Sequence, residues 1–417
     1  MGASSRAGSS VAFGSDGGTD DRCAQLIAGQ RPGHALSREF YCDAELFERE
    51  LRRLMLRHWH CVGHQSEVRE AGAFFTVEVC GESLLVVCGQ DGAVRGFYNV
   101  CRHRGSRVCT ERAGRARGGV FVCPYHAWSY GLDGRLRGAR HMPAGFERAA
   151  YGLTAVHTRV IEGLIFVSFA EQPLGLEHVE AALAGSARLY GWADAKVAHR
   201  ETYPVTANWK LAVENYMECY HCAPAHEEYS RFHLYARPAA LNQEADERVR
   251  RRARELGLAF AELDCWGLNA RAGQEAADSL RSALAAGAVS GSEDGRPLAP
   301  LMGQFQDYDG GVTFFDVGLT SNFLAYPDHG LIYRFSPRAV QSTDMEVIWL
   351  VRADAQAGVD YDQERLTWLW RVTSVADKRI IELNQQGINS RSYQPGPYSP
   401  MEQHTQRLVE WILAELR

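Results

Sequence analysis

The chain has 417 residues, which is enough for two domains of ordinary size. Hydrophobic residues make up 46% and charged residues 23%, so the composition excludes a disordered, collagen-like or coiled-coil protein. The net charge of −6 gives no bulk attraction to nucleic acid or anionic lipid, and no apolar run reaches the ~20 residues of a membrane helix, so we expect neither partner.

The N-terminal segment is rich in Gly and Ser and lacks the apolar core of a secretory signal. It predicts a flexible tail over residues 1–35. The chain contains 11 cysteines, an odd number without an export signal, which favours a reducing compartment. We therefore expect a cytoplasmic protein in which some cysteines bind metal.

Apolar residues recur at helical spacing after the tail and predict a helix over 36–59 that packs on the second half of the chain. Short runs of β-branched and aromatic residues then predict strands, separated by Asp-Gly turns. These strands lie at 74–79, 84–87, 94–100 and 163–169. We therefore predict a small all-β domain over 60–170.

The composition changes after residue 170. Segments 171–200 and 240–290 are Ala-rich and helical in character, and the arginines between Ala245 and Leu256 are expected to form a solvated helix face. Strands return later, and a long helix is predicted to begin near Asp362. The returning strands lie at 313–315, 330–335 and 345–351. The second half is thus predicted to be an α+β domain.

Two short segments each place one cysteine and one histidine at the end of a predicted strand, namely Cys101-Arg-His103 and Cys123-Pro-Tyr-His126. Zinc sites built from two loops usually pair Cys with Cys or His with His. A Rieske [2Fe–2S] centre needs two cysteines on one iron and two histidines on the other. The pattern therefore predicts a Rieske cluster, with a zinc ribbon as the alternative.

A second cluster lies at 207–226, where Glu218 and His221 share one face of a predicted helix. Pro224 is expected to end this helix, which leaves His226 just past its terminus and free to turn back. Two histidines near a carboxylate are typical of a mononuclear iron site with open positions for O₂ and substrate. The alternative, two buried structural histidines, is disfavoured beside the first cluster.

The third ligand is a choice between two carboxylates of the C-terminal helix. At helical spacing Asp377 falls on an apolar stripe with Trp370 and Ile381, whereas Glu382 falls on another face with Lys378. A carboxylate on an apolar face is costly unless it is paired or bound to metal. We therefore predict Asp377 as the ligand, with a buried structural ion pair as the alternative.

The segments 99–106 and 123–130 resemble the two ligand loops of the Rieske family nearly residue for residue. One departure is Ala127, where the family usually has Gly, so the backbone there must accommodate a Cβ. From about Tyr41 to Leu416 the chain resembles the large (α) subunit of Rieske non-haem iron oxygenases.

This resemblance implies an all-β Rieske domain plus a catalytic domain over 171–417 with a helix-grip fold, an antiparallel sheet with helices. It implies a [2Fe–2S] cluster and a mononuclear non-haem Fe(II). It also implies a homotrimer in which the cluster of one subunit serves the iron of its neighbour. The implied cluster ligands are Cys101, His103, Cys123 and His126, and the implied iron ligands are His221, His226 and Asp377.

Most ring hydroxylases have Asp three residues before the first iron histidine, where it bridges the two centres between subunits. This chain has Glu218 in the segment Glu-Asn-Tyr-Met-Glu-Cys-Tyr-His, which is similar to the branch acting on quaternary ammonium compounds. The stretch from Asp360 to Pro397 looks most like the betaine demethylase members. The resemblance therefore implies oxidation of an N-methyl (or adjacent) C–H bond of a compound such as glycine betaine or stachydrine, with release of formaldehyde on demethylation.

The implied co-substrate is O₂, and the electrons are expected from a separate NAD(P)H-dependent flavin/iron–sulfur reductase, because the chain has no Gly-x-Gly-x-x-Gly motif after a strand. Aromatic faces are the expected means of holding a trimethylammonium group. The candidates for the pocket wall are Phe305, Tyr308, Phe314, Phe315, Phe323 and Tyr326. The alternatives are an arene or heteroarene ring hydroxylase and a Rieske electron carrier, which would leave the second cluster without a purpose.

Overall fold

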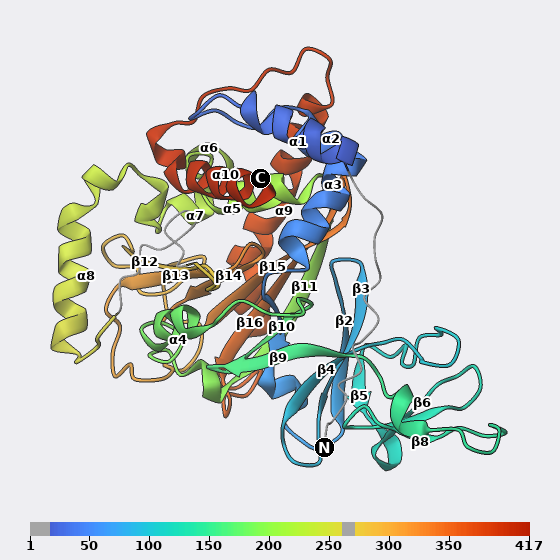
Figure 1. Ribbon diagram of the computed structural model, residues 1–417. Helices are drawn as coiled ribbons and strands as arrows, with labels where there is room; N and C mark the ends of the chain where they lie inside the picture. Colours follow the sequence, from blue (N-terminus) through green and yellow to red (C-terminus); the bar gives the residue numbers. More distant parts are fainter. Residues whose placement is uncertain (1–16, 261–271) are drawn as a thin grey trace.

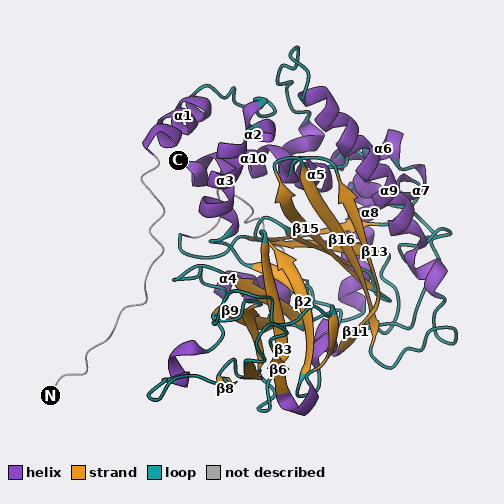
Figure 2. Cartoon of the chain, turned by 90° about the vertical axis from the view of Figure 1, so that its right-hand side faces the viewer, coloured by secondary structure: helices purple, strands orange, loops and turns teal. Residues whose placement is uncertain are grey.

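The computed structural model describes residues 17–260 and 272–417 (Figures 1 and 2). The predicted helix over 36–59 is wrong as a single element, because it is divided into α2 (Glu39–Cys42), α3 (Ala44–Glu50) and a π-helical turn, Leu51–Met55. Asp43 causes the break, since its extended backbone lets its side chain accept hydrogen bonds from the first turn of α3.

The flexible tail predicted over 1–35 is also wrong in part, because Gly17–Ala28 forms helix α1. Residues 1–16 lie outside the described residues. The segment after the tail packs against the second half of the chain: Arg49 donates to the backbone oxygen of Leu416, and Glu50 forms a buried ion pair with Lys210.

Seven antiparallel strands form the sheet of the first domain, in the order β1-β10-β9-β4-β3-β2-β5. They are β1 (His60–His64), β2 (Ala73–Val79), β3 (Glu82–Cys88), β4 (Val94–Tyr98), β5 (Ala113–Arg115), β9 (Ala155–Ile161) and β10 (Leu164–Ser168). The strands β6 (Val120–Val122), β7 (Ser129–Gly131) and β8 (Leu136–Gly138) form a smaller sheet at its tip. The predicted all-β strands are thus present.

Six antiparallel strands form the second sheet, in the order β11-β16-β15-β14-β13-β12. They are β11 (Ala195–Val205), β12 (Ala277–Ala283), β13 (Gly311–Val317), β14 (Ser321–Ala325), β15 (Gly330–Ala339) and β16 (Ser342–Arg352). Helical character predicted throughout 240–290 is wrong at β12, whose alternating side chains pair in register with β13. Figure 1 shows the two sheets side by side, with most helices above the second sheet.

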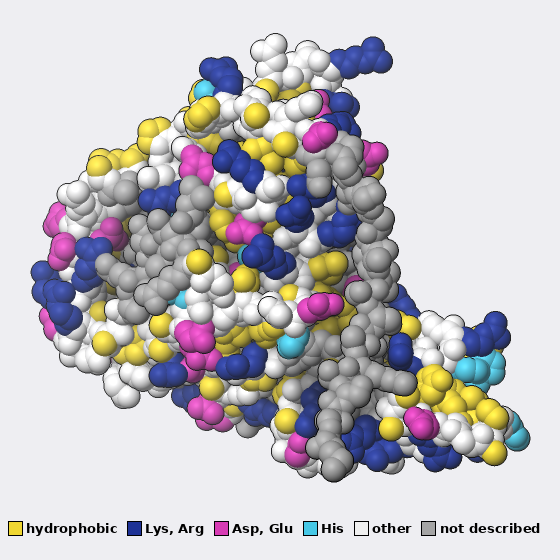
Figure 3. All heavy atoms as spheres, viewed as in Figure 1, with side chains coloured by type: hydrophobic (Ala, Val, Ile, Leu, Met, Phe, Trp, Pro, Cys, Tyr) yellow, Lys and Arg dark blue, Asp and Glu magenta, His cyan; other side chains and the backbone are white. Residues whose placement is uncertain are grey.

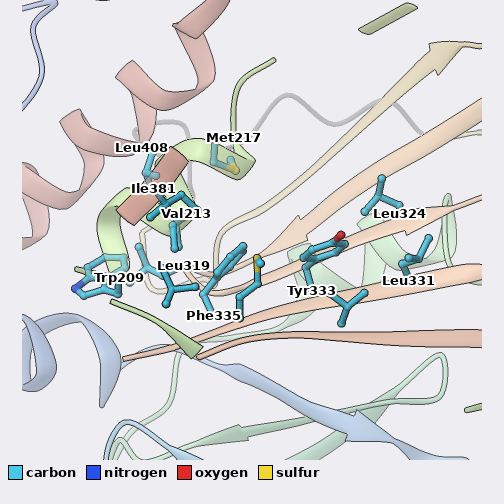
Figure 4. Packing of buried hydrophobic residues seen from close by; sticks show 14 of the residues in the cluster. Trp209, Val213, Met217, Leu319, Leu324, Leu331, Tyr333, Phe335, Ile381 and Leu408 are labelled. Atoms are coloured by element: carbon cyan, nitrogen blue, oxygen red, sulfur yellow. The ribbon is translucent and has the colours of Figure 1, made fainter. Parts of the chain in front are cut away.

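The helices that matter for the site are α5 (Trp209–Tyr216), α6 (Cys222–Ala225), α7 (Glu227–Ser230) and the long α9 (Gln363–Ile388), which begins after its cap Asp362 as expected. The remaining helices are α4 (Glu177–Ala184), α8 (Gln243–Glu255) and α10 (Gln403–Leu416). No helix in the described part of the chain is long and apolar enough to cross a membrane. Figure 4 shows Val213 and Ile381 from the helices above Leu319 and Phe335, with Tyr333 and Leu324 farther along the sheet.

A network of ion pairs joins the two sheets. Arg200 of β11 binds Glu67, which precedes β2, and Glu346 of β16. Arg334 of β15 binds Glu346 and donates to the backbone oxygen of Glu78 in β2. Because Glu346 and Arg334 are almost completely buried, this network fixes the orientation of the first domain on the second.

Candidate functional site

The four predicted cluster residues converge at the tip of the first domain. His103 Nδ1 and His126 Nδ1 lie 3.2 Å apart, so both imidazoles direct the same nitrogen toward one point. The thiols of Cys101 and Cys123 are buried, whereas His103 is half-buried and His126 is exposed. This donor set fits a Rieske cluster, with sulfur ligands inside and nitrogen ligands at the surface.

The two loops repeat one hydrogen-bonding pattern. The backbone N–H of Cys101 donates to the oxygen of Ser106, and the N–H of Gly105 donates back to the oxygen of Cys101. The loop that begins at Cys123 has the same two bonds, to the fifth and from the fourth residue after the cysteine. Gly105 has φ +77°, and Ala127 at the equivalent position has φ +57°. Ala127 therefore adopts a left-handed backbone conformation, which glycine adopts more easily because it has no Cβ.

His221, His226 and Asp377 also come together. His226 Nε2 lies 2.7 Å and His221 Nε2 lies 3.4 Å from Asp377 Oδ1. One ligand atom from each residue lies within 4.8 Å of the others. Two imidazoles and one carboxylate form the donor set of mononuclear non-haem iron sites, and this geometry fits that metal.

The local fold differs from the predicted continuous helix through Pro224. Helix α5 starts at the side chain of Asn208, which accepts from Lys210 N, but it ends at Tyr216. Pro224 lies inside the short helix α6, where a missing N–H costs little because the first turn of a helix leaves its N–H groups unpaired. His221 and His226 therefore flank α6.

Glu218 fixes the ring of His221. Its Oε1 accepts a hydrogen bond of 2.6 Å from His221 Nδ1, and its other oxygen accepts from the backbone of Tyr220. Burial lowers the pKa of His221, but the hydrogen bonds to Asp377 and Glu218 outweigh it and raise that pKa to about 9. Burial likewise raises the pKa of Asp377, and the hydrogen bonds from both histidines outweigh it, so that pKa is lowered.

Glu382, the rejected ligand, lies on another side of α9. Its carboxylate accepts from the backbone N–H of Thr206 and pairs with Lys378. The structure also joins Cys219 and Cys222 by a disulfide, a bond that the expectation of reduced cysteines did not include. These two residues flank His221 closely in the chain, so the link constrains the loop that presents this histidine.

A small cavity adjoins these groups, and its wall is aromatic. Four rings come from separate elements: Tyr216 ends α5, Tyr229 lies in α7, Phe314 lies in β13 and Trp370 lies in α9. Tyr235 completes this wall, with its ring centroid 5.2 Å from that of Phe314. None of the described residues that line the cavity is Lys or Arg.

Phe305, Tyr308, Phe323 and Tyr326, which were predicted to wall the pocket, do not line this cavity. Phe323 stacks on Phe315 on the opposite face of the sheet, because neighbouring strand residues point to opposite sides. Phe305 packs on Tyr190, Tyr308 donates to Asp328, and the hydroxyl of Tyr326 pairs with His233. Phe314 alone of the six candidates lines the cavity among the described residues.

The cavity residues that sequence reasoning missed are Tyr216, Tyr229, Tyr235 and Trp370. A usable signal existed for Trp370, because it lies two helical turns before Asp377 and was placed on the same stripe. Tyr216 lies within the segment of the second cluster, and Tyr229 follows this segment by three residues.

Both domains of the chain match known protein families. Residues 192–417 match the model of the ring hydroxylating alpha subunit (catalytic domain), and residues 58–157 match that of the Rieske [2Fe-2S] domain. The chain is 35% identical to the glycine betaine monooxygenase oxygenase subunit of Chromohalobacter salexigens, over 91% of this chain and 85% of that protein. It is 39% identical to the carnitine monooxygenase oxygenase subunit of Escherichia coli, over 46% of this chain and 52% of that protein.

Among solved structures, the quaternary ammonium Rieske monooxygenase CntA superposes with a TM-score of 0.70 at 24% identity, covering 94% of this chain and 97% of that one. Naphthalene 1,2-dioxygenase superposes with a TM-score of 0.65 at 17% identity, covering 92% of both chains. These two likenesses show the fold. The family matches confirm the predicted fold class and both cofactors, a [2Fe–2S] cluster and a mononuclear non-haem iron, and the chain belongs to the Rieske non-haem iron monooxygenases as an oxygenase subunit.

Proposed function

We propose that this chain oxidises an N-methyl C–H bond of a quaternary ammonium compound such as glycine betaine or stachydrine. The observation that carries the proposal is the aromatic cavity beside His221, His226 and Asp377, since aromatic rings attract a cation that no hydrogen bond can hold. The identity of 35% to a glycine betaine monooxygenase over most of both chains supports the same substrate class.

The metal ligands that we assign are the four cluster residues at the tip and His221, His226 and Asp377 at the cavity. When bound, the two iron centres supply electrons and activate O₂. Glu218 holds the proton on Nδ1 of His221, which leaves Nε2 free to bind metal. The aromatic wall orients the substrate and keeps bulk water from the reacting carbon.

The overall reaction balances with one substrate, O₂, two electrons and two protons. One oxygen atom enters the C–H bond to give an N-hydroxymethyl group, and the other leaves as water. The C–N bond of this hemiaminal then breaks, which releases formaldehyde and the demethylated amine. NAD(P)H gives up its two electrons together as a hydride, whereas a [2Fe–2S] cluster accepts one electron at a time. We therefore propose a separate flavin/iron–sulfur reductase as partner, and the cytoplasm as the location.

We further propose a head-to-tail homotrimer in which Glu218 links the cluster of one subunit to the iron of the next. Within one chain the cluster loops near β6 and the iron residues near α6 lie far apart in Figures 1 and 2. Exposed apolar side chains surround the cluster loops, and Figure 3 shows a hydrophobic patch with histidines beside it at this tip. The residues concerned are Val100, Val122, Tyr125 and Tyr151.

An exposed aromatic side chain also adjoins the iron site, because Tyr220 directly precedes His221 in the chain. Exposed apolar side chains of this kind mark protein contacts. A ring of identical subunits requires such contacts at both metal sites of one chain.

The test is an anaerobic single turnover. Chemically reduced, iron-loaded protein is mixed with O₂ and with glycine betaine, stachydrine, choline, carnitine or benzoate in separate reactions, which needs no reductase. Formaldehyde from an N-methylated substrate, absent in Asp377→Ala, is the expected result. Betaine aldehyde from choline would place the oxidation on the adjacent carbon. Oxidised benzoate without formaldehyde would overturn the proposal in favour of a ring hydroxylase.

A further inference from the structure

One buried carboxylate near the cavity lacks a basic partner. Asp316 of β13 is 8% exposed, and its Oδ1 accepts a hydrogen bond of 2.7 Å from Asn322 Nδ2 on β14. No Lys, Arg or His in the described part of the chain forms an ion pair with it. The adjacent position on β12 is occupied by Asp278, a second carboxylate. Burial of a charge without a partner is costly, so the arrangement calls for an explanation.

Five other buried carboxylates of the described residues are each paired with a base at ion-pair distance, as expected where charges leave water. These pairs are Glu50 with Lys210, Glu275 with His58, Asp309 with Arg281, Asp328 with His329, and Glu346 with Arg334. Asp316 departs from this pattern, as does Glu214, whose carboxylate accepts hydrogen bonds from the hydroxyl of Tyr41. Burial, followed by the neighbouring Asp278, raises the pKa of Asp316 to about 8, so its carboxyl group loses its proton most readily when a cation lies beside it.

Asn322 has an unsatisfied hydrogen-bond acceptor at the same place. Its side chain is completely buried, and its Oδ1 has no hydrogen-bond partner in the structure. Nearby, the hydroxyl of Tyr216 is also buried without a partner. Unsatisfied buried polar atoms are uncommon in folded proteins, and a group of them beside a cavity indicates a place for a ligand.

Asp316 lies behind the aromatic wall of the cavity. It shares a sheet face with Phe314, two residues earlier on the same strand, and Phe314 pairs across to Leu324, which also lines the cavity. Its charge reaches the two tyrosines of that wall: burial first, and Asp316 next, raises the pKa of Tyr216 and of Tyr235. The carboxylate therefore acts on the same space that the rings enclose.

We propose that Asp316 is the counter-ion for the positive charge of the substrate and thereby sets the preference of the site for cations over neutral molecules. This inference rests on the proposed function and names the residue that selects the charge. The rings of Tyr216, Tyr235, Phe314 and Trp370 contact the ammonium methyl groups, and the carboxylate behind them adds attraction that water does not screen. A neutral arene gains nothing from Asp316, so a ring hydroxylase would have no use for it.

The experiment compares ligands that differ in charge and not in shape. Choline and 3,3-dimethyl-1-butanol share one outline, with a cationic nitrogen replaced by carbon, and glycine betaine and 3,3-dimethylbutanoate form a second pair. Binding to the iron-loaded holoenzyme without O₂ is measured by calorimetry for wild type, for Asp316→Asn and for Asp307→Asn. Asp307 is an exposed carboxylate paired with Arg252 on the surface, and its variant is the matched control.

Asp316→Asn is expected to weaken binding of the ammonium ligand about tenfold or more, and to leave its carbon analogue unchanged. Wild type is expected to prefer the cation of each pair, and Asp307→Asn to behave as wild type. Equal loss for both members of a pair, or no loss for either, would overturn the counter-ion role while the proposed function stands. Failure of wild type to bind or oxidise any ammonium compound would overturn both.

The stability of Asp316→Asn distinguishes the counter-ion role from a purely structural one. Replacement of a buried, unpaired carboxylate by an amide removes a burial cost. Under the counter-ion role, Asp316→Asn is therefore expected to keep the iron content and cluster spectrum of wild type, and to match or exceed its melting temperature. A variant that loses stability and ligand affinity together would contradict the inference, because the loss would then reflect the fold.

Discussion

His226 Nε2 lies 2.7 Å from Asp377 Oδ1, although 151 residues separate the two in the chain. The contact exists because the long helix α9 passes over the same sheet face as α5 and α6, so that one turn of α9 meets the loop that holds both histidines. The candidate iron site is therefore assembled by tertiary packing and not by a local motif.

Asp377→Ala is expected to abolish binding of the mononuclear iron and turnover, while the Rieske cluster keeps its visible spectrum, because the cluster ligands lie in the other domain. Iron analysis and absorption spectroscopy on the same sample check this. Glu382→Ala is the matched control on the same helix: it loses the contacts to Thr206 and Lys378 and is expected to keep all its iron. Mononuclear iron retained in Asp377→Ala, beyond the iron of the cluster, would disprove the assignment of Asp377 as a ligand.

The proposed electron transfer between subunits predicts that two inactive variants restore activity when they are combined in one trimer. Cys101→Ser lacks the cluster and Asp377→Ala lacks the iron, so each is expected to be inactive alone. In trimers formed by co-expression in equal amounts, about a quarter of the interfaces pair an intact cluster with an intact neighbouring iron, and about that fraction of wild-type activity should return. Activity that stays at zero would mean that each chain uses its own cluster.

The buried pair of Lys210 with Glu50 predicts that the N-terminal segment is part of the catalytic fold. Lys210 Nζ lies 2.7 Å from both carboxylate oxygens, and Trp209 donates to the same carboxylate. Lys210→Met should lower the free energy of unfolding by about 3–5 kcal/mol, because it leaves a buried charge alone. The double variant Lys210→Met/Glu50→Gln should recover much of that loss in urea unfolding, and no recovery would exclude charge as the cause.

Glu214 predicts a stability that falls as pH rises. Burial raises the pKa of its carboxyl from 4.5 to about 7, against the opposing hydrogen bond from Tyr41. Between these values the unfolded chain has lost the proton and the folded chain keeps it, so the free energy of unfolding declines with pH, by up to about 3 kcal/mol. Glu214→Gln should remove this decline and stabilise the protein at pH 8 but not at pH 4.5. Melting curves check this, with the exposed Glu45→Gln as a control that should show no such difference.

Ala127→Gly is expected to raise the stability of the cluster loop. Its φ of +57° costs an alanine roughly 1–2 kcal/mol, and the greater freedom of glycine in the unfolded chain offsets about 0.4–1 kcal/mol of the gain. The temperature at which the cluster colour disappears should therefore rise slightly. Ala113→Gly in the extended strand β5 is the control and should lower it. A lower temperature for Ala127→Gly would show that the Cβ makes a contact worth more than the strain.

Much of the fold was predictable because the signals are local. Strand runs such as 74–79 and 345–351 carry their own pattern, and the cap Asp362 marks the start of α9. The break at Asp43 was missed because a side-chain cap overrode a continuous apolar period. The strand β12 was missed because its Ala-rich composition suits a helix, and its pairing with β13 depends on residues far along the chain.

The candidate site was predictable where chemistry limits the choice. Clusters of cysteine, histidine and carboxylate side chains indicate a metal site. A carboxylate of α9 can join the two histidines when it faces inward, and this criterion selected Asp377 over Glu382. The pocket wall was not predictable, because Phe314 and Phe315 are alike in composition and differ in which face of the sheet they occupy. That alternation becomes visible when the register with Leu324 and Phe323 is known.

The ion-pair network of Arg200, Glu346 and Arg334 makes each subunit a rigid spacer between its two ends. A chain held in this way cannot bend to bring its own tip to its own cavity, so under the proposed transfer between subunits the working unit is a contact between two copies. Dilution below the dissociation constant of the assembly would leave every metal in place and every chain folded, and the specific activity would nevertheless fall toward zero. Specific activity would thus depend on enzyme concentration, although no single subunit changes its fold or its metal content.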